Sequence, residues 1–153
     1  PEAIDVVVHP ESIVHSLVEY CDGAVMAQLG LPDMAIPISL AFEYPKRLPN
    51  RLPRLDLKKA GSLTFEAPDM ETFPCLKFAY DALKAGKTYC AALNAANEVA
   101  VAAFLEERIA FCDISDCLDE VLQRHVPSES GDLESIIRAD EEARRMARHI
   151  LEV

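Results

Sequence analysis

Hydrophobic and polar residues follow a β-strand pattern in the first 30 positions of the chain. Residues 6–8 are three valines, and apolar positions continue through residues 13–20. Asp22 and Gly23 then stand where a two-residue hairpin turn requires positive φ. The pattern predicts a strand segment followed by a β-hairpin whose return strand covers residues 24–29.

From residue 73 onward the apolar residues recur with the 3.6-residue period of helices. The first stripe ends near Gly86, and Asp113 is predicted as the N-cap of the third helix. Four amphipathic helices cannot each bury a stripe alone, so the pattern predicts an antiparallel four-helix bundle. The four stripes are Phe73, Leu76, Tyr80 and Leu83; Leu93, Ala96, Ala100, Val101, Phe104 and Leu105; Ile114, Cys117, Leu118, Val121 and Leu122; and Leu133, Ile136, Ile137, Ala143, Ala147, Ile150 and Leu151.

Prolines mark the boundary between these two patterns, because nine of the ten fall in residues 1–74. A short helix or loop is predicted over residues 32–42. The stretch YPKRLPNRLPRL (44–55) carries prolines that forbid regular helix and favour an extended linker. The predicted fold class is α+β, in three parts: a β segment over 1–43, a proline-rich linker over 44–72 and a helical bundle over 73–153.

Composition narrows the possible partners. Fifteen basic against 26 acidic residues give a net charge of −11, so the basic surface that nucleic acids require is missing. No GxGxxG or P-loop motif occurs, which places most binding of any nucleotide phosphates outside this chain. No apolar run approaches the roughly 20 residues that span a membrane. Because the chain opens on Pro1 without a leader, we expect it to be part of a longer polypeptide.

The five cysteines are odd in number and form no CxxC pair, so neither a disulfide framework nor a zinc site is indicated. We expect reduced, mostly buried thiols in a cytoplasmic protein. The cysteines are Cys21, Cys75, Cys90, Cys112 and Cys117.

His15 is the strongest candidate for an active-site residue. If strand alternation holds, it shares a face with Ile13 and Leu17, where an imidazole could donate to a phosphate or orient a substrate. The alternative is a structural histidine. A metal site built from His9, Glu11, His15 and Asp22 is disfavoured, because side chains along a strand alternate between its faces.

Polar residues also interrupt the helical region. Asn94, Asn97 and Glu98 lie in an alanine-rich helix, where such groups usually bind neighbouring elements. Asp140 and Arg144 are four residues apart and predict an intrahelical ion pair.

The motif HPxSxxH, formed by His9, Pro10, Ser12 and His15, resembles a pattern of the 1-deoxy-D-xylulose 5-phosphate reductoisomerase family. The segments LTFEAPDMETFPCLKFAYDAL (63–83) and ALNAANEVAVAAFLEERIAFCDI (92–114) carry the same resemblance, which extends over nearly all of the chain. These enzymes depend on NADPH and a divalent metal. The resemblance is to their C-terminal part, comprising the end of the catalytic-domain sheet, a linker and the helical domain.

This resemblance implies roles for four residues. His15 is expected to be catalytic and to bind substrate, and Ser12 to contact substrate. Pro32 and Met34 are expected to pack against the nicotinamide ring. From the residues alone, Met34 is instead a core side chain that follows a helix cap at Asp33. The family commonly has a basic residue where this chain has Ala35, so an anion contact there is in doubt.

The resemblance also implies NADPH with Mg or Mn as cofactors of the intact enzyme. No cofactor is expected to bind this chain alone, and no residue of it matches the family's upstream metal ligands. A homodimer is expected to form through the hairpin sheet. The chain is also expected to bind the missing nucleotide-binding and metal-binding parts of the same protein. The competing interpretation is a helical protein-interaction domain with a β-hairpin appendage and no catalysis.

Overall fold

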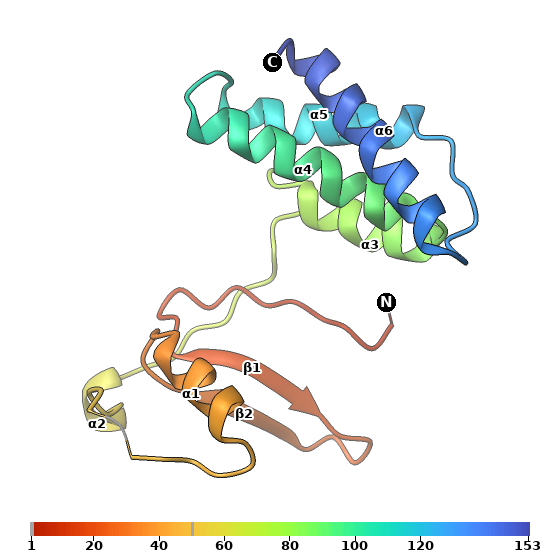
Figure 1. Ribbon diagram of the computed structural model, residues 1–153. Helices are drawn as coiled ribbons and strands as arrows, with labels where there is room; N and C mark the ends of the chain where they lie inside the picture. Colours follow the sequence, from red (N-terminus) through yellow and green to blue (C-terminus); the bar gives the residue numbers. More distant parts are fainter. Residues whose placement is uncertain (1, 50) are drawn as a thin grey trace. The chain divides into compact units, whose positions relative to one another are not determined.

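The protein has an α+β fold that divides into two units (Figure 1). The computed structural model describes residues 2–49 and 51–153, so Pro1 and position 50 of the predicted linker lie outside the described residues. One unit is Asp5–Pro68, and the other joins residues 2–4 to Asp69–Val153. Each unit is described by itself below.

The first unit contains the predicted hairpin. Strand β1 (Val14–Glu19) pairs antiparallel with β2 (Val25–Leu29). The turn is longer than the two residues predicted, because the Tyr20 N–H donates to the Ala24 carbonyl oxygen at 2.9 Å across three intervening residues. Gly23 takes the left-handed conformation there, with φ +83°. A three-residue loop that ends on a left-handed glycine matches the right-handed twist of the strands.

Two helices and a returning segment complete this unit. The predicted helix or loop over 32–42 is helix α1 (Ala35–Glu43), and the short helix α2 (Leu57–Ala60) lies within the proline-rich stretch. Val8 and Glu66 then form an isolated antiparallel bridge, with both backbone hydrogen bonds at 2.9 Å. The segment after α2 therefore returns to the residues that precede the hairpin.

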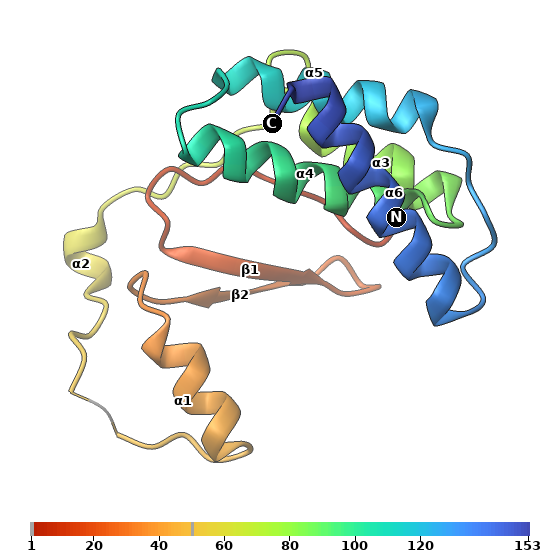
Figure 2. The same cartoon turned by 45° about the horizontal axis from the view of Figure 1, so that its top comes forward.

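The second unit consists of helices α3 (Cys75–Ala85), α4 (Tyr89–Leu105), α5 (Phe111–Arg124) and α6 (Leu133–Leu151). Helix α4 packs against the other three (Figure 2). Small side chains let the helix backbones approach closely, so dispersion contacts between many atoms stabilise the unit. Its buried apolar residues are Ala82 of α3; Ala92, Ala95, Ala96, Ala100 and Ala103 of α4; Ile114, Cys117, Leu118 and Val121 of α5; and Ala139, Ala143 and Ala147 of α6.

The predicted apolar stripe of α6 is wrong in the first turns of that helix. Leu133 is 71% exposed and Ile137 is 47% exposed. The buried positions follow the i, i+4 series Ser135, Ala139, Ala143 and Ala147. The reason is that α4 presents alanines, so the α6 face that packs on it consists of small residues rather than large ones.

Two further expectations need correction. Asp113 is not the N-cap of α5, because the helix begins two residues earlier, at Phe111. The Asp113 carboxylate instead accepts a hydrogen bond from the Ala110 N–H at 2.7 Å. The cysteines are free but not mostly buried. Cys117 is buried, and its burial raises the thiol pKa to about 11. Cys75 is half-buried, whereas Cys21, Cys90 and Cys112 are exposed.

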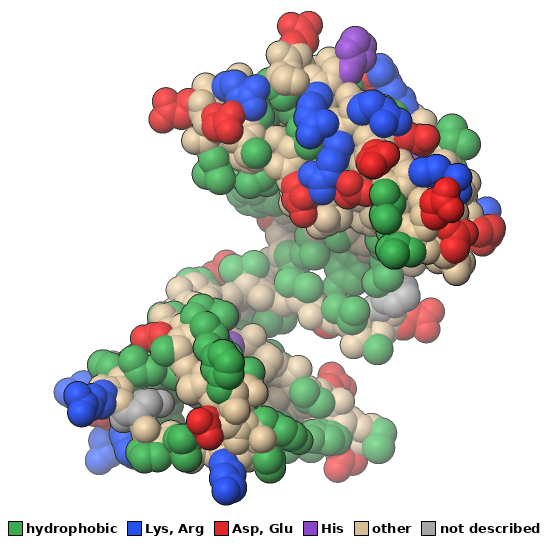
Figure 3. Space-filling model, viewed as in Figure 1, with side chains coloured by type: hydrophobic (Ala, Val, Ile, Leu, Met, Phe, Trp, Pro, Cys, Tyr) green, Lys and Arg blue, Asp and Glu red, His purple; other side chains and the backbone are tan. Residues whose placement is uncertain are grey.

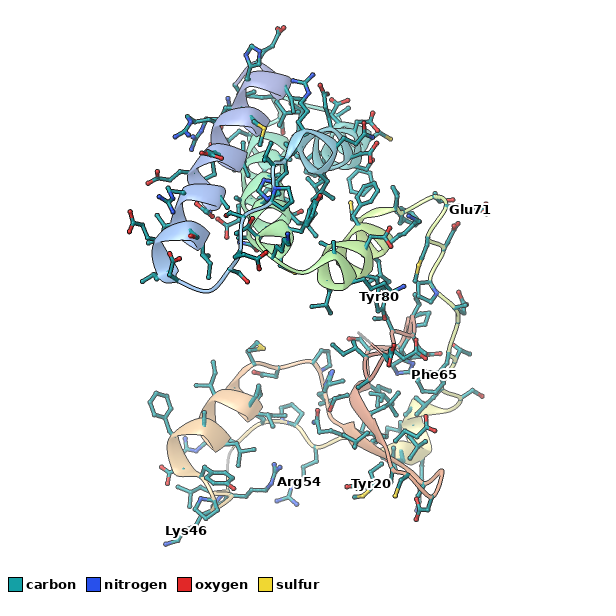
Figure 4. All side chains as sticks on the ribbon, turned by 90° about the vertical axis from the view of Figure 1, so that its right-hand side faces the viewer. Tyr20, Lys46, Arg54, Phe65, Glu71 and Tyr80 are labelled. Atoms are coloured by element: carbon teal, nitrogen blue, oxygen red, sulfur yellow. The ribbon has the colours of Figure 1, made fainter. Side chains whose placement is uncertain are left out.

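Polar contacts fix the edges of the helical unit. The predicted ion pair is confirmed, with Arg144 Nε 2.7 Å from Asp140 Oδ2, and the same guanidinium reaches Glu98 Oε2 at 2.6 Å. Tyr80, labelled in Figure 4, donates its hydroxyl to the Ile4 carbonyl oxygen at 3.2 Å and so ties residues 2–4 to α3. None of the helices in the described residues is long and apolar enough to cross a membrane.

His125 lies in a buried polar cluster between the loops that flank α4 and α5. Its Nε2 is 2.9 Å from the Thr88 hydroxyl, which also accepts from the Ser128 N–H at 3.1 Å. The ring meets Tyr89 edge to face, with centroids 5.3 Å apart. Burial lowers the pKa of His125, and the nearby Glu142 carboxylate opposes this shift.

Enlarging a buried alanine should destabilise the helical unit. We expect Ala96→Leu to lower the free energy of unfolding by about 1–3 kcal/mol, because the added methylenes have no space between α4 and its neighbours. Ala102→Leu, on the exposed side of the same helix, is the matched control. Urea unfolding followed by helical circular dichroism measures both, and equal losses would contradict the assigned face.

Acid should destabilise the helical unit through His125. Below the ordinary histidine pKa of 6.5 the unfolded chain takes up a proton that the folded state resists, so stability present at pH 7 falls as the pH drops towards the lower folded pKa. His125→Gln should flatten this part of the profile, and His149→Gln, at an exposed histidine of α6, should not. Parallel profiles for wild type and His125→Gln would exclude His125 as the cause.

Candidate active site

A cavity of about 560 Å³ lies within the first unit, formed by the hairpin, the loop that follows it and α1. All four residues predicted for the site, Ser12, His15, Pro32 and Met34, line it. These four come from two parts of the sequence, 12–15 and 32–34, and Arg47 joins them from a third. The lining is completed by Ser16, Gln28, Leu31, Asp33, Ile36, Pro37, Leu40 and Arg47.

His15 occupies an irregular position in β1. Val14 lies opposite Leu29 and Ser16 lies opposite Gln28, so His15 is an extra residue in the ladder. The alternation that would have grouped it with Ile13 and Leu17 therefore breaks at this position. A β-bulge re-aims a side chain, and such bulges are frequent beside active sites.

The His15 ring lies near the backbone of Gly30, at ordinary van der Waals distance. A Cβ placed on this buried glycine would lie 3.8 Å from His15 Nε2 and 3.5 Å from the Gln28 side-chain nitrogen. The Gly30 N–H also donates to the Ile13 carbonyl oxygen at 3.0 Å, which closes the end of the hairpin. The bulge in β1 therefore places the ring next to the end of the hairpin that Gly30 closes.

Ser12 adopts a left-handed backbone with φ +51°. Its N–H donates to the His9 carbonyl oxygen at 3.1 Å, closing a turn over residues 9–12. A left-handed non-glycine residue costs on the order of 1–3 kcal/mol and persists only where surrounding contacts hold it. The strain lies directly beside the cavity that Ser12 lines.

The local pattern predicted Met34 as a core side chain. This prediction is wrong, because 69% of Met34 is exposed. It occupies the N-cap position of α1, which lacks a side-chain cap hydrogen bond. The Asp33 carboxylate instead accepts from the Ala35 N–H at 2.8 Å and fixes the turn into the helix. Pro32 and Met34 thus form an apolar, accessible wall of the cavity.

Arg47 is the cavity residue that sequence reasoning missed. It belongs to the proline-rich stretch that was interpreted as linker, and nothing local relates it to His15. It brings a guanidinium to the cavity, whose lining does not include Ala35. Only the cluster of basic residues over 46–54 could have suggested an anion contact.

His9 does not line this cavity, but it lines a smaller one together with His15. Its Nδ1 is 2.7 Å from the Thr64 carbonyl oxygen and 3.1 Å from Glu11 Oε2, and its ring stacks on Phe65, labelled in Figure 4. Within residues 2–49 and 51–153, no group of three or more His, Cys, Asp or Glu is placed to hold a metal ion.

The hairpin unit carries much exposed apolar surface, visible as hydrophobic side chains in Figure 3. Val18, Val25 and Met26 of the strands are each more than half exposed, and Phe42 of α1 is 85% exposed. Val18 and Met26 lie directly opposite each other in the register, so they form one exposed apolar patch of the kind that marks an interaction surface. Helix α6, by contrast, presents charged side chains of both signs.

Together, these features define an α+β chain with a cavity that combines an imidazole, a strained serine and an apolar wall. Residues 29–146 match the family model described as DXP reductoisomerase C-terminal domain. The chain therefore belongs to the DXP reductoisomerase C-terminal domain family.

Relatives agree with this assignment along nearly the whole chain. The 1-deoxy-D-xylulose 5-phosphate reductoisomerase of Chlorobium limicola is 55% identical over 150 residues, which cover 98% of this chain and 39% of that protein. The enzyme of the same name from Acetivibrio thermocellus is 52% identical over 148 residues, covering 97% of this chain and 39% of the relative. The chain thus spans about 39% of the length of the curated relatives it matches.

Solved structures give the same result. The Zymomonas mobilis reductoisomerase in complex with NADPH has a TM-score of 0.86 and 43% identity, covering 96% of this chain and 39% of that one. A reductoisomerase in complex with NADPH, fosmidomycin and magnesium has a TM-score of 0.89 and 44% identity, covering 95% of this chain and 38% of that one.

Proposed function

We propose that this chain supplies one wall of the active site of a reductoisomerase that converts 1-deoxy-D-xylulose 5-phosphate to 2-C-methyl-D-erythritol 4-phosphate with NADPH. The observation that carries the proposal is the convergence of Ser12, His15, Pro32 and Met34 on one cavity. Family membership and the identity to reductoisomerases support it. Under this proposal the chain is inactive without the rest of the enzyme.

His15 and Ser12 are the proposed substrate contacts. The His15 imidazole can donate to a phosphate oxygen or hold a proton near the reacting atoms, and it is the proposed catalytic residue. The Ser12 hydroxyl can accept from or donate to a substrate hydroxyl. Arg47 extends this set with the charged donor that a phosphorylated substrate needs.

Pro32 and Met34 are the proposed nicotinamide contacts. The apolar, accessible wall they form fits the flat ring, because it excludes water without offering groups that compete for hydride. NADPH supplies the hydride of the reaction when bound, and a divalent metal polarises the substrate oxygens. The described residues do not fit a metal site, so we assign no step of this chain to Mg or Mn and place those ligands upstream.

We also propose the domain division expected from the sequence. Residues 1–43 end the catalytic domain, residues 44–72 link it to the next domain and pack on it as far as Pro68, and residues 73–153 form the C-terminal antiparallel four-helix bundle domain. The packing of α4 against α3, α5 and α6 supports the last assignment. The free cysteines support a cytoplasmic location.

The proposed partner is a second copy of the chain, bound through the hairpin sheet. A two-stranded ribbon is marginal alone, and exposed strand edges pair readily with other strands. The exposed Val18 and Val25 of β1 and β2 support this assignment.

The enzyme proposal is tested in a chimera in which this chain replaces the matching 39% of the Chlorobium limicola reductoisomerase. We expect an active enzyme in which His15→Gln lowers kcat/KM by on the order of 100-fold, because general acid or base catalysis is worth at least that factor. The melting temperature should stay nearly unchanged, and exposed His149→Gln is the matched control.

Two results would count against this proposal. An inactive but folded chimera would reject the function, and full activity in the His15→Gln chimera would reject the role of His15.

The dimer proposal predicts that the chain sediments as a dimer at high micromolar concentration. Val18→Lys and Val25→Lys should each raise the dissociation constant about tenfold or more, since each places a charge on an apolar contact. Leu105→Lys, at a 74% exposed leucine of α4, is the control and should change nothing. A monomeric wild-type chain would overturn this proposal.

A further inference from the structure

Thr64 is joined to the 9–12 turn by three polar contacts across more than 50 residues of sequence. Its carbonyl oxygen accepts from His9 Nδ1 at 2.7 Å. Its hydroxyl donates to Glu11 Oε1 at 2.7 Å, and its N–H donates to Glu11 Oε2 at 3.2 Å. We call His9, Glu11 and Thr64 the Thr64 clamp.

The clamp determines which ring nitrogen of His9 carries a proton. Nδ1 faces the Thr64 carbonyl oxygen and, at 3.1 Å, a Glu11 carboxylate oxygen, and both are acceptors. The proton must therefore sit on Nδ1. The opposite nitrogen, Nε2, is buried without a partner among the described residues, so every polar contact of this ring is directed at the clamp. Stacking on Phe65, with centroids 4.7 Å apart, holds the ring plane.

The clamp also keeps Glu11 ionised. The hydrogen bond from the Thr64 hydroxyl is the largest cause that lowers the pKa of Glu11, and the backbone N–H groups and His9 act in the same direction. A carboxylate that receives two hydrogen bonds from one residue is held in both position and orientation.

None of the three clamp residues lines the proposed substrate cavity, yet they hold the turn that does. Glu11 directly precedes Ser12, whose left-handed φ of +51° needs support from its surroundings. The Ser12 N–H bonds to the carbonyl of His9 itself. Three residues further on, β1 reaches the bulge at His15.

We infer that Thr64, through Glu11 and His9, is a positioning residue of the active site that holds Ser12 and His15 at the cavity. The inference rests on the proposed function, and it deepens that proposal by extending the site into the proline-rich segment.

The first test compares Thr64→Val with Thr64→Ser in the chimera. Valine keeps the shape of threonine and its backbone contacts but loses the hydroxyl donor to Glu11, whereas serine keeps that donor. We expect Thr64→Val to lower kcat/KM about tenfold and Thr64→Ser to stay within about twofold of wild type. Thr72→Val is the matched control, because the Thr72 hydroxyl bonds to the Asp69 carboxylate in the other unit.

The second test observes the His15 ring directly and requires no enzymatic activity. In the 153-residue chain labelled with ¹⁵N-histidine, Thr64→Val should shift the ring signals of His15, and Thr64→Ser and Thr72→Val should not. An inactive wild-type chimera would reject the proposed function while this spectrum still tests the clamp. Unchanged His15 signals together with unchanged kcat/KM in Thr64→Val would overturn the inference.

Discussion

The hairpin unit depends on the return of residues 64–66 to residues 8–11. The hairpin has two strands, and a ribbon of that size is marginal in water. The bridge between Val8 and Glu66 and the contacts of Thr64 join it to a distant segment of the chain. Without this pairing, little in the described residues would hold the strained turn at Ser12. Residues that do not line the cavity thus bind the turn that carries Ser12 to it.

The helical unit is stabilised in a different way. Its core consists largely of alanines on α4 and α6, with Leu118 and Val121 of α5 among the largest fully buried side chains. Close backbone approach replaces the burial of large side chains, and this explains why apolar residues such as Leu133 remain exposed. The unit is therefore sensitive to enlargement at its centre and tolerant at its outer faces.

Local patterns predicted the helices and strands well, because the apolar periods and the helix end at Gly86 depend only on residues close together in the sequence. The resemblance to a known motif identified Ser12, His15, Pro32 and Met34, and the structure brings these residues to one cavity. The bulge at His15 could not be predicted, since it depends on the register with β2. Arg47 and Thr64 were missed for a related reason: their contacts lie many residues away in sequence.

The chain builds the cavity wall that carries Ser12 from its own contacts. Native-state hydrogen exchange of the chain tests it at the Val8, Ser12, Thr64 and Glu66 amides, which all donate hydrogen bonds. We expect these amides to exchange on the order of 100-fold more slowly than in an unstructured peptide, with protection close to that of the β1 and β2 amides. Exchange at the unstructured rate while β1 and β2 stay protected would contradict it, because the turn would then form only with the rest of the enzyme.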